Sequence, residues 1–218
     1  VINMSFGKSF SPEKKWVDEA VSYAESKDVL LVHASGNESH NMDSVDNFPN
    51  SNLLTLNKEA SNFISVGASG DKNIAAGKII PDFTNYGKRT VDVFAPGVKI
   101  YSTLPGGNAY GFLNGTSMAA PVVTGIAALI RSYYPALSAK QVKYAIEKSA
   151  ENLTGNAMVA EPGTERNVLM SDLCTTGGFV NADAAMELAA TLKPETADNK
   201  KKDNRVKSTL TNLKDSKN

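Results

Sequence analysis

Short apolar runs alternate along the chain with amphipathic stretches. Apolar runs that are typical of strands covered on both faces occupy residues 1–4, 29–32, 63–68 and 91–95. Helices are predicted from residue 11 to at least residue 24, and at residues 118–134, 138–150 and 181–192. Because strand and helix signals alternate, we expect an α/β fold with a mostly parallel sheet flanked by helices.

The first predicted helix has both a start signal and an apolar face. Ser11, Pro12 and Glu13 supply a capping side chain, a proline in the first position and an acid in the first turn. We expect its buried face to consist of Trp16, Val17, Ala20, Val21 and Ala24.

The segment Val1–Gly7 reads as a buried strand followed by a turn. Such a strand needs neighbours on both sides, and no initiator methionine, signal peptide or cap precedes it in this sequence. We therefore expect further sequence upstream in the natural product. The alternative is a complete domain whose boundary happens to fall here.

The segments between these elements differ in character. Residues 99–103 and 110–113 are predicted to form an antiparallel pair, whereas 38–62 is a polar surface excursion and 151–178 is irregular; both of the latter resemble insertions. Residues 193–218 are polar and rich in lysine, so they cannot bury enough apolar surface to offset the entropy of ordering. We expect one domain over residues 1–192, followed by a tail that is disordered or needs a partner.

Composition excludes several classes of protein. With 41% hydrophobic and 21% charged residues the chain is typical of a soluble globular domain. Its formal net charge of zero gives no electrostatic reason to expect nucleic acid as a partner. No apolar run approaches the roughly 20 residues of a membrane span. Cys174 is the single cysteine, so no intramolecular disulfide can form.

The most informative segment is Asn114–Pro121, in which small residues lead into Ser117 at the start of a helix. There the hydroxyl is exposed beside the free N–H groups and the positive end of the helix. Such a position suits a nucleophile whose attack creates an oxyanion. The alternative is that Ser117 only caps the helix, and this segment alone does not decide between the two.

The motif Gly115-Thr116-Ser117-Met118-Ala119-Ala120-Pro121 resembles the nucleophile signature of the subtilisin-like (subtilase) family of serine proteases. Further segments resemble motifs of that family in its order, and these are Val1–Gly7, Ala34–Glu38, Ile64–Ala68, Phe83–Gly87, Asp92–Gly97 and Gly178–Ala182. Several ordered matches argue against chance. The resemblance implies a three-layer subtilisin-like α/β fold, present here without its N-terminal strands and helices, and a serine endopeptidase acting on proteins or peptides.

The resemblance also assigns roles to residues. Ser117 would be the nucleophile and would offer its backbone N–H to the oxyanion, with the Asn37 side-chain amide as the second donor. The residues implied to flank the pocket for the side chain before the scissile bond are Ser5, Phe6, Gly7, Ala34, Ser35 and Gly36. The alternatives are a turn residue for Asn37 and ordinary strand-to-loop packing for the others.

A general base is missing from this constellation. In the family the order along the chain is Asp, His, Ser, so both earlier motifs are expected before Val1, in a missing N-terminal part of the same domain. His33 and His40 lack the family's histidine context, and we expect a strand-end residue and a solvated loop residue, respectively. Asp92 matches a structural strand. Without histidine and aspartate the chain alone is expected to be inactive.

Other properties are only implied. The chemistry needs no cofactor; Asp43 and Asp46 lie in an oxygen-rich stretch that could hold calcium, but it lacks the spacing of a calcium loop, so no metal ligand is assigned. The resemblance implies a secreted, periplasmic or cell-surface enzyme. Substrate preference is not revealed, because the pocket floor lies in the divergent segment 38–62. Two alternatives stay open: a non-catalytic binding or scaffold module, and a cleavage product that remains bound to its N-terminal partner.

Overall fold

The computed structural model describes residues 1–71, 78–153 and 158–195. Its central sheet has, in spatial order, β1 (Ile2–Met4), β2 (Leu31–Ala34), β5 (Phe63–Ser69), β6 (Val93–Pro96), β12 (Gly178–Phe179) and β9 (Glu151–Asn152). The first five strands of this order are parallel to one another, and the last strand, β9, pairs antiparallel with β12. The sheet therefore confirms the expected α/β fold.

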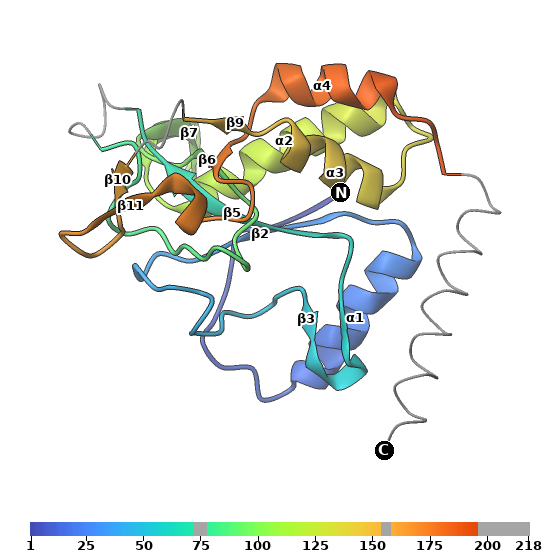
Figure 1. Cartoon of the computed structure of the whole chain (residues 1–218), viewed down its shortest axis with the longest axis horizontal. Coiled ribbons are helices and arrows are strands. Elements are labelled where there is room, and N and C mark those ends of the chain that lie inside the picture. The colour runs from blue at the N-terminus through green and yellow to red at the C-terminus, as the bar shows by residue number, and fades with distance from the viewer. Residues whose placement is uncertain (72–77, 154–157, 196–218) are drawn as a thin grey trace.

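Helices cover the sheet on both faces, which gives three layers (Figure 1). α2 (Thr116–Tyr133), α3 (Ala139–Lys148) and α4 (Ala182–Thr191) lie on one side, and α1 (Lys14–Ser26) lies on the other. The smaller elements are the pairs β3 (Asn52–Leu53) with β4 (Lys58–Glu59), β7 (Ile100–Leu104) with β8 (Ala109–Leu113) and β10 (Met158–Ala160) with β11 (Asn167–Leu169), and the 3₁₀ turns η1 (Leu54–Leu56) and η2 (Met170–Asp172).

The largest core lies between the sheet and α2. Because side chains alternate along a strand, every second residue of β2, β5 and β6 faces this helix. The strand residues in that core are Val32, Ala34, Ile64, Val66, Ala68, Val93 and Ala95. α2 contributes Ala119, Ala120, Val123, Ile126, Ala127 and Ile130, each no more than 8% exposed. Because these helix residues are buried against three strands, the position of α2 on the sheet is fixed, and with it the position of the start of the helix.

α1 packs on the opposite face through a different set of residues than predicted. Val21 is buried, but Trp16 is 66% exposed and Ala20 is also exposed, so that part of the prediction was wrong. Asp18 is buried instead: its carboxylate pairs with Lys14 at 2.8 Å and accepts hydrogen bonds from the N–H and hydroxyl of Thr55. Burial would raise the pKa of Asp18, but these hydrogen bonds outweigh it and lower the pKa.

Some element boundaries also differ from the predictions. α1 begins at Lys14 and has no side-chain cap, so the predicted Ser11 cap is wrong. Residues 151–178 are not irregular throughout, because β9, β10, β11, η2 and the start of β12 lie there. Strands of two or three residues are too short to give a readable period, which is why the pattern missed them.

Other predictions are confirmed. β5, the β7–β8 hairpin, α3 and α4 fall where expected, and Ser138 caps α3 in a capping box with Gln141. β1 is the edge of the described sheet and pairs with β2, leaving Ile2 48% exposed, so within this chain it lacks the second neighbour that we expected. α4 packs in the main core through Ala185 and Ala189. Most of the predicted tail, residues 196–218, lies outside the described residues.

A half-buried ion cluster joins α3 to the sheet at the end where β6 begins. Lys143 Nζ lies 3.2 Å from Asp92 Oδ1 and 3.3 Å from Glu147 Oε1, and it donates to the Phe63 carbonyl at 2.6 Å. Asp92 also accepts the Ser65 N–H. Burial raises the pKa of Glu147 to about 7, although Lys143 opposes this effect. Asp92 thus has structural partners here.

The raised pKa of Glu147 predicts a specific pH dependence of stability. Because the folded state holds this proton more tightly than an ordinary glutamate of pKa 4.5, its contribution is fully present below pH 4.5 and is lost as pH rises through about 7. Glu147→Gln should therefore flatten the decline in the free energy of unfolding over that range, measured by urea unfolding. The exposed Glu187→Gln serves as control. Parallel curves for the protein and Glu147→Gln would contradict the prediction.

Candidate active site

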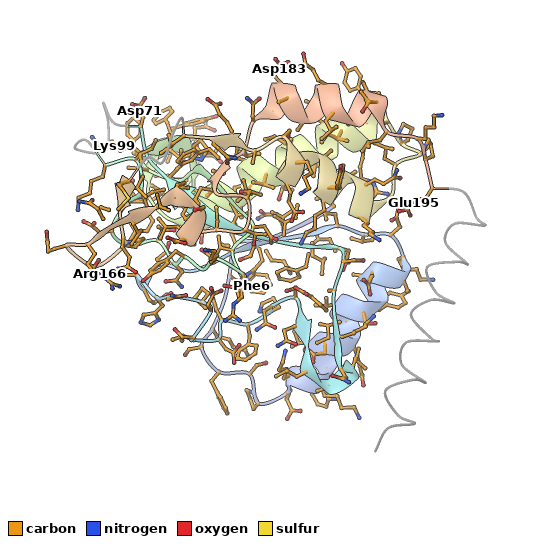
Figure 2. The ribbon with its side chains drawn as sticks, viewed as in Figure 1. Phe6, Asp71, Lys99, Arg166, Asp183 and Glu195 are labelled. Carbon is orange, nitrogen blue, oxygen red and sulfur yellow. The ribbon has the colours of Figure 1, made fainter. Side chains whose placement is uncertain are left out.

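A cavity of about 480 Å³ opens where β1 and β2 end and α2 begins. Ligands of open α/β sheets bind at this edge, because loops and helix N-termini converge at the carboxyl ends of the strands. Its lining comes from four segments, and the residues are Phe6 to Ser9, Ala34, Gly36 to Glu38, His40, Met42, Val45 to Asn47, Asn85, Thr116 and Ser117. Phe6, 64% exposed, lies near the middle of the view, in the region between the sheet and α1 (Figure 2).

Ser117 is the second residue of α2, after Gly115 at the N-cap. Its hydroxyl donates to the Ser5 carbonyl at 3.3 Å, and the Ser5 hydroxyl donates to the Ser117 carbonyl at 2.8 Å. The first four N–H groups of a helix have no partner within it, so the Ser117 N–H and the positive helix end are available to an anion. A nucleophile and an anion-binding donor therefore come from one residue.

Asn37 lies beside Ser117 with its side-chain orientation determined by hydrogen bonds. Its Oδ1 accepts the Thr116 N–H at 2.8 Å and the Thr116 hydroxyl at 3.1 Å. Only an oxygen can accept from a backbone N–H, so Nδ2 must be on the other side of the amide. Thr116 Oγ1 in turn accepts the Gly36 N–H at 3.1 Å. The geometry leaves the Asn37 amide N–H groups available as hydrogen-bond donors.

Asn85 organises the loop that carries Asn37. Its Oδ1 accepts the N–H groups of Glu38 and His40, and its Nδ2 donates to the Ser35 carbonyl and to Glu38 Oε2. Asn85 is buried, so each of these bonds replaces a solvent contact that the loop would otherwise need. The loop after β2 is thus held by a side chain that comes from between β5 and β6.

Neither histidine is bonded to the Ser117 hydroxyl. His33 is buried in β2, and its Nε2 lies 2.8 Å from the Phe6 carbonyl oxygen. Burial lowers the pKa of His33 to about 4, so the ring is neutral at pH 7. His40 is exposed in the loop, as predicted, and lines the cavity, but its described hydrogen bonds are made by its backbone, to the Asn85 side chain and from the Tyr86 N–H. Neither of the two histidines in the sequence therefore makes the hydrogen bond to the Ser117 hydroxyl that a general base needs.

The residues predicted from sequence divide into two groups. Phe6, Gly7, Ala34, Gly36, Asn37 and Ser117 line the cavity together. Ser5 and Ser35 lie behind its wall: Ser5 bonds to Ser117, and the Ser35 carbonyl accepts from Asn47 and Asn85. The functional roles that the sequence assigned to all eight remain predictions.

Sequence reasoning missed several residues of the site. Asn85 belongs to a motif that we had matched, but nothing in its spacing revealed that it supports the loop of Asn37. Lys8, Glu38 and Asn47 line the cavity and are given no role by the sequence, and Asp46, which also lines it, is considered there only as a calcium ligand. Asp46 and Asn47 come from the divergent segment 38–62, where no periodic pattern exists to place side chains.

The structure also bears on metal ions and membranes. Asp43 accepts hydrogen bonds from the Arg89 N–H and the Thr90 hydroxyl, so one of the two aspartates of the oxygen-rich stretch has protein partners. Within the described ranges there is no group of three or more acidic, histidine or cysteine side chains placed to hold a metal ion. Over the same ranges, none of the helices has the length and apolar character that crossing a membrane requires.

Comparison with known proteins gives consistent matches. The family model described as "Subtilase family" matches residues 1–168. Subtilisin DY of Bacillus licheniformis is 40% identical over 155 residues, which cover 70% of this chain and 50% of that protein. Subtilisin BL of Lederbergia lenta is 36% identical over 185 residues, covering 85% of this chain and 55% of that protein. The chain thus spans about half the length of these relatives.

A solved structure supports the same fold. The prenylagaramide maturation protease PagA matches with a TM-score of 0.63 at 26% identity. The match covers 86% of this chain and 61% of that one. The likeness therefore extends over most of the described layers and not only over the motif around Ser117.

The rigidity of the loop after β2 leads to a prediction about Gly36. It adopts φ +108°, and a Cβ there would lie 2.6 Å from Glu38 Oε2 and would overlap the Asn85 amide. Gly106 adopts φ +103° with no atom within 4 Å of such a Cβ, so Gly106→Ala measures backbone strain alone. Strain costs about 1–3 kcal/mol. Gly36→Ala should lower the free energy of unfolding by at least about 1 kcal/mol more than Gly106→Ala, measured in urea. Equal losses would show that the loop yields to the added methyl group.

Proposed function

Because the chain belongs to the subtilase family, we propose that it supplies the nucleophile and the oxyanion site of a serine endopeptidase. The observation that carries this proposal is the position of Ser117 at the N-terminus of α2, beside an Asn37 amide whose N–H groups are available for bonding. Two donors and a nucleophile within one cavity are what acyl transfer requires. The substrates proposed are proteins or peptides.

The proposed chemistry follows from these positions. Ser117 Oγ attacks the carbonyl carbon of a peptide bond and gives its proton to a base, while the carbonyl oxygen takes the negative charge. The Ser117 N–H and Asn37 Nδ2 hold this oxyanion. The base then protonates the leaving nitrogen, the C–N bond breaks, and an acyl-enzyme remains. Water, deprotonated by the same base, releases the acid and restores Ser117. No step calls for a cofactor.

The base itself is proposed to come from residues outside these 218. His33 is buried and bonded to Phe6, and the Ser117 hydroxyl points to the Ser5 carbonyl instead of a histidine. A second part of the same protein, carrying a histidine and an aspartate, would complete the site. By itself the chain would then retain only the weak catalysis of binding and oxyanion stabilisation. A secreted, periplasmic or cell-surface location is proposed from family membership alone.

A labelling experiment tests the proposal. The complete protein, the 218-residue chain and the chain mixed with the preceding part of the protein are treated with a fluorophosphonate, and Ser117 is identified by peptide mass spectrometry. We expect labelling in the complete protein and in the mixture, none with Ser117→Ala, and little in the chain alone. Absence of labelling and of peptide hydrolysis in the complete protein would contradict the proposal and favour a non-catalytic binding module.

The oriented amide of Asn37 predicts a loss in kcat with little change in KM. Removing the corresponding donor in a subtilisin costs about 10²–10³-fold in kcat, a magnitude that belongs to that family member and is carried over to this one. Asn37→Ala should reproduce it in peptide-hydrolysis kinetics of the complete protein. Asn114→Ala is the matched control. Asn114 shortly precedes Ser117 in the sequence, but its Oδ1 accepts the Lys99 N–H at the β7–β8 hairpin. A loss below about threefold for Asn37→Ala would exclude the role.

A further inference from the structure

The charges of the cavity beside Ser117 are unequal. Its carboxylates are Glu38 and Asp46, and its lysine is Lys8. Two carboxylates and one lysine give these three side chains together one net negative charge. Apolar atoms of Phe6, Met42 and Val45 cover other parts of the same wall. A cavity that combines apolar walls with a carboxylate fits a long side chain with a cationic end.

The two carboxylates are not equivalent. Glu38 Oε2 accepts the Asn37 N–H at 2.9 Å and Asn85 Nδ2 at 2.7 Å, so this side chain is already used to shape the loop. Asp46 receives one long contact of 3.5 Å from Asn50 Nδ2. No lysine, arginine or histidine nitrogen among the described residues forms an ion pair with Asp46. Its charge is therefore available to a ligand.

Asp46 lies on a segment that two cavities share. The segment 42–47 separates this cavity from a second one of about 510 Å³, because Met42, Val45, Asp46 and Asn47 line both. The Asn47 side chain is held by neighbouring segments: its Nδ2 donates to the Ser35 carbonyl at 2.9 Å, and its amide lies against Gly7. Asp46 is thus next in sequence to a residue whose side chain is held by a hydrogen bond.

We propose that this cavity selects a lysine or arginine side chain immediately before the cleaved bond, with Asp46 as the residue that pairs with its charge. The inference rests on the proposed function, since Ser117 defines which side chain of a bound peptide enters the cavity. Lys8 at the rim opposes the preference. Glu38 adds to the negative potential but acts mainly by holding the loop of Asn37.

Two peptides test the preference without any catalysis. Acetylated tetrapeptides that end in arginine or in leucine are products of the proposed cleavage, and their Kd values are measured by calorimetry on the complete protein carrying Ser117→Ala. We expect the arginine peptide to bind about fivefold tighter, the upper end of the range for a partly exposed ion pair. The ratio should fall as salt rises, because screening weakens exposed charge pairs.

Variants assign the effect to residues. Asp46→Asn keeps the size of the side chain, so the Kd ratio should fall about three- to fivefold, whereas Lys8→Gln should raise it. Asp172→Asn removes one charge from an exposed, remote carboxylate and is the control for overall charge. In the protein with Ser117 intact, kcat/KM for matched arginine and leucine substrates should follow the same order.

The outcomes separate this inference from the proposed function. Equal binding of both peptides, or a ratio that Asp46→Asn and Asp172→Asn lower alike, would overturn the role of Asp46 even if Ser117 is labelled. A ratio that depends on Asp46, without labelling or hydrolysis at Ser117, would keep the cation pocket and overturn the protease. Binding of the leucine peptide in preference would show that the apolar wall decides.

Discussion

The burial of α2 against the sheet is the constraint on which the whole site depends. Ala119, Ala120 and Val123 are fully buried, so the first turn of the helix cannot move without opening the main core. That first turn contains Thr116 and Ser117, and Thr116 is itself fully buried. Its N–H and hydroxyl both bind Asn37 Oδ1, which couples the helix to the loop after β2. The packing of α2 in the core thereby fixes the orientation of the Asn37 side-chain amide.

Several polar groups around the cavity are joined by a chain of hydrogen bonds that passes through Asn85. That residue joins Ser35, Glu38 and His40, and Asn47 reaches the same Ser35 carbonyl from the other side. A buried network of this kind is rigid only when each member has its partners. Because Gly36 lies within it without a side chain, the backbone can approach both amides closely. The loop therefore presents Asn37 with little freedom.

The accuracy of the sequence-based predictions followed the strength of the local signal. The strand at 63–68 and the helix after Ser138 were placed correctly, because a continuous apolar run and a capping box are local features. The buried face of α1 was wrong, because Asp18 is compensated by Lys14 and Thr55, and a partner 37 residues away leaves no trace in the local pattern. The motifs around Ser117 and Asn37 could be recognised in the sequence. The positions of Asp46 and Asn47 could not be predicted, because they depend on the course of a loop without periodicity.

Some residues of the cavity could be identified from the sequence and others could not. This difference has a physical basis in what each part of the cavity is proposed to do. An oxyanion site needs donors within a narrow range of distance, and the two donors proposed for it come from a helix start packed in the core and from the loop after a strand. Recognition of a side chain tolerates more variation, since a charge attracts over several ångströms and an apolar wall is non-directional. A carboxylate on the exposed segment 42–47 can therefore alter which residue is preferred while the geometry at Ser117 stays the same. Asp46 is adjacent in sequence to Asn47, which is bonded into the rigid loop, so its charge is held near the cavity although the segment that carries it is largely exposed.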